Sequence, residues 1–269
     1  MPSLLKIAIS VAFMGASLCA QAVAQAGPQD QPYGDALENR TEGRPVVHLF
    51  GDSIFRGWAL KKFPDQYTEE EAEEDLLWPL RSPVSMLRMV SDRDYEVGYG
   101  GGTGLPTAST GAVLQRMLSG DIHDGDIVVL EDAGDHSKDP MAFYLLLMDL
   151  RVTLCQKDID VIFLNTYDDI PPGALTADWG IEDEDIFRWS VPFDGMTMND
   201  SFAKAARAKI VDCKQPYLID VHGLLRDVKN REHVVVHEDG IHPNITGQWA
   251  ISLALDKKVE EILSERGAE

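Results

Sequence analysis

Five short apolar runs, each followed by a stretch with helical periodicity, constrain the fold of this chain more than any other feature. Each run is rich in β-branched residues and is bounded by polar or turn-forming residues. Apolar character at nearly every position is typical of strands covered on both faces, as in parallel sheets. The runs span residues 45–50, 95–99, 126–130, 160–164 and 217–221. Their alternation with helices predicts an α/β three-layer sandwich around a five-stranded parallel sheet.

Helical patterns fill the intervals between these runs. The helix expected to begin at Asn199 has a favoured capping residue there. The helix expected over residues 141–155 is apolar around much of its circumference, which predicts that it is well buried. In such sheets ligands bind at the carboxyl ends of the strands, so the residues that follow each strand are the first candidates for a site. Helices are expected within residues 69–90 and over residues 112–118, 141–155, 199–213 and 245–263.

The amino-terminal segment has the features of a secretion signal. An apolar stretch over residues 7–18 follows a weakly basic start, and the small-x-small triplet at residues 24–26 precedes a cleavage point. The apolar stretch is too short for a comfortable membrane span, and no later segment offers one. We therefore expect a periplasmic or secreted protein. Its parts are a signal peptide (1–26), a leader segment (27–44) and a single domain (45–265) with an insertion at about residues 58–77.

The charge of the chain disfavours two classes of partner. Acidic residues number 45 and basic residues 24, for a net charge of −21. Such a chain is a poor electrostatic match for nucleic-acid phosphates or anionic membranes. The remaining expectation is a small-molecule or polysaccharide substrate. The histidines show no zinc-binding spacing, so no metal is expected. The oligomeric state stays open.

Two cysteines lie outside the expected signal peptide. Cys155 and Cys213 each fall near the end of a predicted helix that leads into a strand. An oxidising compartment permits them to pair, but two buried free thiols fit the pattern equally well.

Two segments, one at each end of the domain, carry the residue types of a serine nucleophile and its base. Ser53 follows the first strand in Gly51-Asp52-Ser53, where a tight turn before a helix exposes the hydroxyl. Near the C-terminus, Asp239 precedes His242 by three residues. Asp239 can accept one ring N–H of His242, which leaves the other ring nitrogen free to take the proton of Ser53.

The end of the third strand is unusually acidic. Glu131, Asp132 and Asp135 follow one another closely here. They can cap helices or pair with nearby arginines, they can contribute to an oxyanion or substrate site, or they can act as an acid–base pair on a glycosidic bond. The sequence alone leaves these three interpretations open.

Taken together, the two end segments resemble the SGNH hydrolase superfamily, also called GDSL-type esterases and lipases, over residues 45–263. Residues 51–53 match its first block and residues 239–244 its last block, while Gly102 matches the glycine of the second block. The third block departs from the family pattern. The family has Gly-x-Asn-Asp, whereas this chain has Ala133-Gly134-Asp135-His136 and no asparagine.

The resemblance implies a flavodoxin-like sheet and acyl-ester chemistry with no metal or organic cofactor. Ser53 would attack, His242 would act as the base and Asp239 would orient the imidazole. The resemblance also implies an oxyanion site formed by the Ser53 and Gly102 backbone N–H groups. A protonated Asp135, or the backbone N–H of Gly134 or Asp135, could replace the missing asparagine, and the sequence leaves this open. Loss of one such donor costs about 2.7–4 kcal/mol in the transition state.

Export and the aromatic residues of the long segment 168–197 favour carbohydrate esters as substrates. Three alternatives remain on the same scaffold. The first is an O-acyltransferase that uses the same triad. The second is a glycoside-acting enzyme that uses Glu131, Asp132 and Asp135. The third is a non-catalytic glycan binder.

Overall fold

The structure is a computed structural model that describes residues 40–51, 55, 83–90, 95–101, 108–131, 139–165, 196–226, 243 and 245–267. Its centre is a sheet of five strands in the order β2-β1-β3-β4-β5, and every pair of neighbours is parallel. The chain order and the parallel pairing confirm the predicted α/β sheet. The strands are β1 (Val46–Phe50), β2 (Glu96–Gly101), β3 (Ile127–Glu131), β4 (Asp160–Leu164) and β5 (Tyr217–Ile219).

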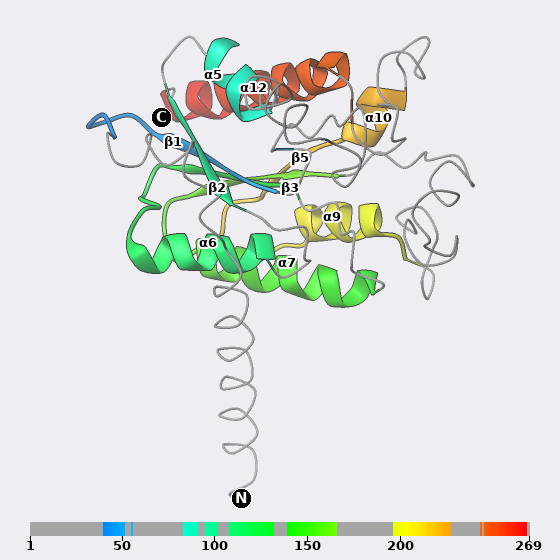
Figure 1. Ribbon diagram of the computed structural model, residues 1–269. Coiled ribbons are helices and arrows are strands. Elements are labelled where there is room, and N and C mark those ends of the chain that lie inside the picture. The colour runs from blue at the N-terminus through cyan, green and yellow to red at the C-terminus, as the bar shows by residue number, and fades with distance from the viewer. Residues whose placement is uncertain are drawn as a thin grey trace, which may run out of the picture.

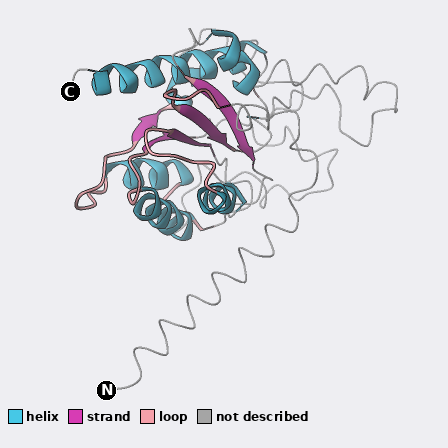
Figure 2. Cartoon of the chain, turned by 90° about the vertical axis from the view of Figure 1, so that its left-hand side faces the viewer, coloured by secondary structure: helices cyan, strands magenta, loops and turns pink. Residues whose placement is uncertain are grey.

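Helices cover both faces of this sheet, as the apolar strands require (Figure 1). One layer contains α6, α7 and α9, and the other contains α5, α10 and α12, with the sheet between them in the side view of Figure 2. All residues of β1, β3 and β4 are buried. The bounds are α5 (Pro83–Val90), α6 (Ala108–Ser119), α7 (Pro140–Leu154), α9 (Met198–Arg207), α10 (Val221–Arg226) and α12 (Ile245–Gly267).

Several element boundaries differ from the sequence expectation; for example, α6 begins at residue 108 instead of 112, and α9 ends at residue 207 instead of 213. Two further differences have a local cause in the hydrogen bonds. Helix α9 begins after Thr197 instead of at Asn199, because Thr197 and Asp200 form a reciprocal capping box. The fifth strand ends at Ile219, and residue 221 already belongs to α10. The carboxylate of Asp220 accepts the backbone N–H of Gly223 at 3.0 Å, so it caps this helix and ends the strand.

Several predicted features lie outside the described residues. They are the signal peptide, nearly all of the leader, the insertion at about residues 58–77 and the aromatic segment 168–195. The signal, the leader and the insertion therefore stay predictions. Within the described residues, no helix is both long and apolar enough to cross a bilayer.

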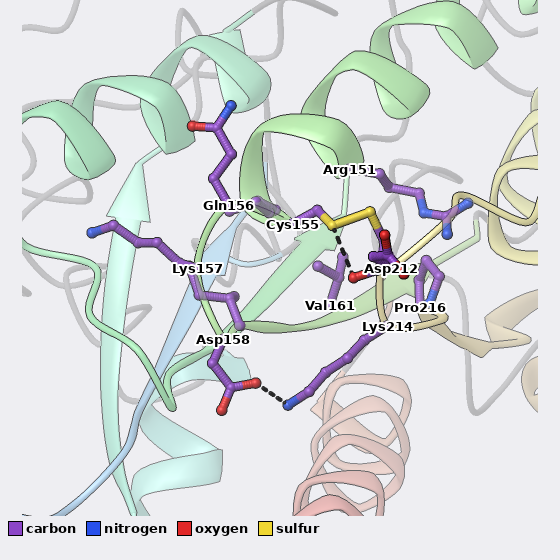
Figure 3. Close-up of a pocket in the computed structure, with 12 residues that line it drawn as sticks. Arg151, Cys155, Gln156, Lys157, Asp158, Val161, Asp212, Lys214 and Pro216 are labelled. Carbon is purple, nitrogen blue, oxygen red and sulfur yellow. Dashed lines mark hydrogen bonds and ion pairs between the residues drawn. A yellow bond between two sulfur atoms is a disulfide. The ribbon is translucent and has the colours of Figure 1, made fainter.

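Cys155 and Cys213 form a disulfide. The bond joins the C-cap of α7 to the connection between α9 and β5, across a sequence separation of 58. It lines a cavity of about 360 Å³ at the amino end of β4, beside the 2.6 Å ion pair between Lys214 and Asp158 (Figure 3). Ligands of such sheets bind at the opposite edge, so we do not take this cavity as the candidate active site.

A buried polar cluster closes the amino edge of the sheet. His48 in β1 is fully buried, and its Nε2 lies 3.0 Å from the Asp126 carboxylate. Asp126 also accepts hydrogen bonds from the Arg40 guanidinium and from the backbone N–H groups of Val46 and His123. Burial alone would raise the pKa of Asp126, but these four donors together hold it well below its ordinary value of 3.8. Burial lowers the pKa of His48 more than the hydrogen bond to Asp126 raises it.

Both shifts predict that acid destabilises the fold. The unfolded chain takes up a proton at His48 below its ordinary pKa of 6.5, whereas the folded chain resists protonation there until lower pH. The contribution of His48 to the free energy of unfolding is therefore complete above pH 6.5, and it is lost as the pH falls from there through the lowered pKa of the folded chain. Asp126 adds a further loss below pH 3.8.

Urea unfolding between about pH 7.5 and about pH 4.5 measures this loss. A His48→Gln variant keeps a donor for Asp126 but does not titrate, so its midpoint should change less between about pH 7 and about pH 5.5. Parallel pH profiles for the variant and the parent protein would contradict the role given to His48.

Candidate active site at the carboxyl edge of the sheet

The carboxyl ends of β1, β3, β4 and β5 meet at one edge of the sheet because all the strands are parallel. The described residues that follow or end these strands are Gly51, Glu131, Asn165 and Asp220. This edge is where a ligand is expected in a sheet of this order. Three of its four residues are polar, although each ends or closely follows an apolar strand.

Strand β1 reaches this edge between β2 and β3. Phe50 pairs with Gly101 of β2 on one side and with Leu130 of β3 on the other. The register between β1 and β2 shifts at this point, since Leu49 pairs with Tyr99 and residue 100 is extra. Such a bulge redirects the chain, and bulges are common beside active sites. The described ends of β1, β2 and β3 therefore lie at adjacent positions on this edge.

Gly51 and Glu131 touch at the start of the predicted nucleophile turn. A Cβ at residue 51 would lie 2.5 Å from Glu131 Oε2, 2.7 Å from the Glu131 carbonyl oxygen and 2.7 Å from the Phe55 ring. Glu131 is only 4% exposed, and Phe55 is fully buried. Glycine is required here because no side chain fits between β3 and the phenylalanine that follows the turn.

A second polar contact lies further along the same edge. Asn165 Nδ2 donates to Asp220 Oδ1 at 2.7 Å, and the backbone N–H of Asn165 donates to the Ile219 carbonyl oxygen at 3.3 Å. The same Asp220 carboxylate caps α10. The sequence interpretation did not select Asn165. A polar residue directly after the apolar run 160–164 was the signal that could have found it.

The predicted triad stays a prediction, because Ser53, Asp239 and His242 lie outside the described residues. The same holds for the other proposed oxyanion and substrate residues except Glu131. The described neighbours limit where these segments begin and end. Gly51 and Phe55 flank Ser53, and Pro243, which is buried, directly follows His242 in front of α12. The residues outside the description are Gly102, Asp132, Gly134 and Asp135.

Among the described residues, no three His, Cys, Asp or Glu side chains are grouped closely enough to hold a metal ion. The described part of the edge contains the buried carboxylate of Glu131, the hydrogen-bonded pair of Asn165 and Asp220, and Gly51. These groups can position a neighbouring turn and hold its backbone in place, which is what a serine nucleophile requires.

Comparison with known proteins was made by sequence and by structure. Neither the protein-family models nor the curated protein sequences match this chain. Solved structures do match. A protein assigned as an acylhydrolase from Bacteroides fragilis is 12% identical with a TM-score of 0.56, and the match covers 89% of this chain and 98% of that chain.

Two further structures have the same architecture. The esterase EstA from a Pseudoalteromonas species, solved in a form inhibited by monoethylphosphonate, is 13% identical with a TM-score of 0.53, covering 81% of this chain and 98% of that one. A protein assigned as an SGNH hydrolase from Slackia heliotrinireducens is 18% identical with a TM-score of 0.50, covering 80% and 98%.

Matches at this level of identity show a shared fold and nothing finer. The chain has the fold of the SGNH hydrolases, which confirms the predicted fold class.

The contact between Gly51 and Glu131 leads to a direct prediction. A Gly51→Ala substitution should force the turn before Ser53 away from β3. Such overpacking typically costs about 1–3 kcal/mol of stability, and a displacement of about 1 Å at a reacting group can lower a rate by about 10²-fold. Thermal unfolding and ester hydrolysis measure the two effects.

Gly111→Ala is the matched control, because a Cβ at Gly111 in α6 meets no atom within 4 Å. It should be neutral or stabilising, since alanine is the better helix former. Equal behaviour of the two variants would contradict the close packing at Gly51.

Proposed function

We propose that this chain is an exported SGNH-type serine hydrolase that cleaves acyl esters, with carbohydrate esters as its substrates. The observation that carries the proposal is the position of Gly51. It lies at the carboxyl end of a central strand, packed without space for a side chain against buried Glu131. Ser53 follows two residues later in the sequence. In an open parallel sheet, substrate binds at the carboxyl ends of the strands.

In the proposed reaction, Ser53 attacks the ester carbonyl carbon and transfers its proton to His242. Asp239 orients His242 and stabilises the imidazolium that forms. The oxyanion accepts hydrogen bonds from the backbone N–H groups of Ser53 and Gly102. Collapse of the tetrahedral intermediate breaks the ester C–O bond, and His242 returns the proton to the leaving alcohol. Water then hydrolyses the acyl-serine by the same proton transfers in reverse, releasing the acid and regenerating the serine hydroxyl.

Glu131 has a supporting role in this proposal. Its carboxylate is buried against the turn, so it holds the backbone that leads to Ser53. A carboxyl group that works on a glycosidic bond must instead reach the substrate. The burial of Glu131 therefore favours the ester reaction over the glycosidic one.

Two observations support export and the substrate class. Residues 1–26 have the pattern of a signal peptide, and the disulfide between Cys155 and Cys213 is a bond that persists in oxidising compartments. An exported acyl-esterase meets acylated polysaccharides outside the cytoplasm, and Trp179, Trp189 and Phe193 are suited to stacking on sugar rings.

Fluorophosphonate labelling followed by intact-mass measurement tests the nucleophile. The parent protein should gain one phosphonyl group, and the Ser53→Ala variant should gain none. The matched control is Ser264→Ala, an exposed serine in α12, which should label like the parent. A folded parent protein that gains no adduct would overturn the proposed serine chemistry.

A panel of esters tests the substrate. Acetate release from acetylated polysaccharides should exceed that of the Ser53→Ala variant and should exceed turnover of long-chain lipid esters. Cleavage of lipid esters without acetate release would contradict the carbohydrate assignment but leave the serine mechanism in place.

A further inference from the structure

Helix α12 runs from one edge of the sheet to the other. Near its end, the Arg266 guanidinium donates to the carbonyl oxygen of Gly125 at 2.6 Å and to Asp160, the first residue of β4, at 3.0 Å. Both partners lie at the amino edge of the sheet. A helix of 23 residues is about 35 Å long. The start of α12 at Ile245 therefore lies at the carboxyl edge, on the side where α10 packs against it (Figure 1).

The buried face of α12 changes from apolar to polar toward this start. Leu255, Val259 and Ile262 on this face belong to the hydrophobic core. Further toward the start, Ser252 and Gln248 are polar and fully buried. The Ser252 hydroxyl donates to the backbone carbonyl oxygen of Gln248 at 2.8 Å, so its polar group is satisfied within the helix.

The side chain of Gln248 has no such partner. It is 0% exposed, and neither Oε1 nor Nε2 has a hydrogen-bond partner in the part of the chain that the structure describes. Buried polar groups are hydrogen-bonded in the great majority of cases, and a buried amide without a partner lowers the stability of the fold. A methionine or leucine would fill this position without that cost. Packing alone therefore does not explain the glutamine.

The place of Gln248 in the helix limits what its amide can reach. It is the fourth residue of α12, and helical side chains point back toward the N-terminus and cover the preceding turn. The amide is therefore directed toward the point where the chain enters α12 after buried Pro243. The residue before Pro243 is His242, the proposed general base. An amide both donates and accepts, so it can hold a backbone segment at two points.

We propose that Gln248 is a positioning residue for His242, and that its amide hydrogen-bonds the backbone of the segment that carries the imidazole. The inference rests on the proposed serine mechanism. In that mechanism the base must lie within about 2.6–3.2 Å of the hydroxyl whose proton it takes, and a small displacement of a reacting group lowers the rate. A hydrogen bond from a packed helix fixes this distance. Gln248 does not touch the substrate, because it is fully buried.

Gln248→Met tests the positioning role, because methionine keeps the length and the burial but removes both hydrogen-bonding groups of the amide. The kcat for a soluble acetyl ester and the rate of fluorophosphonate labelling should both fall by about threefold to tenfold, as expected for one uncharged hydrogen bond. KM should stay within about twofold of the parent value. The urea midpoint should equal or exceed that of the parent, since burying the amide costs stability.

Ser252→Ala is the matched control, because Ser252 is equally buried on the same face of α12, one turn further from His242. Its kcat and labelling rate should equal those of the parent. Parental kcat and labelling rate in Gln248→Met would overturn the positioning role. A lowered urea midpoint in Gln248→Met would overturn it as well, since the amide would then contribute to the stability of the core.

The behaviour of the parent protein separates this inference from the mechanism on which it rests. If the parent gains the phosphonyl group and Gln248→Met gains it at the same rate, only the role of Gln248 is wrong. If the folded parent gains no phosphonyl group, the serine mechanism is wrong, and the positioning role is overturned with it.

Discussion

Ester hydrolysis is expected to fall by about 10³- to 10⁶-fold when either Ser53 or His242 is replaced by alanine. In the proposed mechanism the two residues act as one unit, since the imidazole takes the proton of the serine as the hydroxyl oxygen attacks. Removal of either therefore abolishes the same step. The double variant should be no slower than the single variants, because no further function remains to be lost. Steady-state kcat and kcat/KM with a soluble acetyl ester measure the effect.

Asp239→Asn is the informative companion variant. It keeps the size of the side chain but changes how His242 is oriented and protonated. It should therefore lower kcat by up to about 10⁴-fold. KM should change little in all of these variants, because the triad acts mainly in the transition state. Additive losses in the double variant would contradict the triad. A Ser53→Ala variant with parental activity would direct attention to the carboxylates at the end of β3.

Loss of the disulfide is the second large effect that we expect. The bond closes a loop across a sequence separation of 58 between α7 and the connection that precedes β5. Without it the unfolded chain gains entropy, which corresponds to about 4 kcal/mol for a loop of this length. The Cys155→Ser, Cys213→Ser double variant should therefore unfold at lower urea concentration. Such a loss is a large fraction of the about 5–15 kcal/mol by which domains are stable.

Reduction of the parent protein provides the internal control. Dithiothreitol should lower the urea midpoint of the parent to that of the double variant and should leave the double variant unchanged. The slope of unfolding should be examined as well, because a changed slope would place part of the effect in the unfolded state. A loss of less than about 1 kcal/mol would contradict a main structural role of the bond.

The strands were predictable because their signal is local. A run of β-branched apolar residues can bury both faces only inside a covered sheet. The positions of β1, β3 and β4 therefore follow from these local runs alone. Their order in the sheet agrees with the resemblance to the SGNH hydrolases. The N-terminus of α9 was misjudged for an equally local reason. Asn199 and Thr197 are both good caps, and the reciprocal bonds between Thr197 and Asp200 favour the earlier start.

The contacts at the site edge were not predictable in the same way. Glu131 had three interpretations from its sequence neighbours, and Asn165 had none. Their positions against Gly51 and Asp220 depend on strand register, which joins residues 80 and 55 positions apart in the chain. No local pattern encodes such distances.

Composition, periodicity and short motifs were thus sufficient for the class of fold and the parallel sheet, because both depend on neighbours along the chain. Ser53, His242 and Asp239 stay predictions of the same local motifs. Only the folded arrangement decided that Cys155 pairs with Cys213 and that the buried Glu131 carboxylate packs against Gly51. These features arise when packing brings distant segments together, and the free energy of burial, which acts on the whole domain, selects that arrangement.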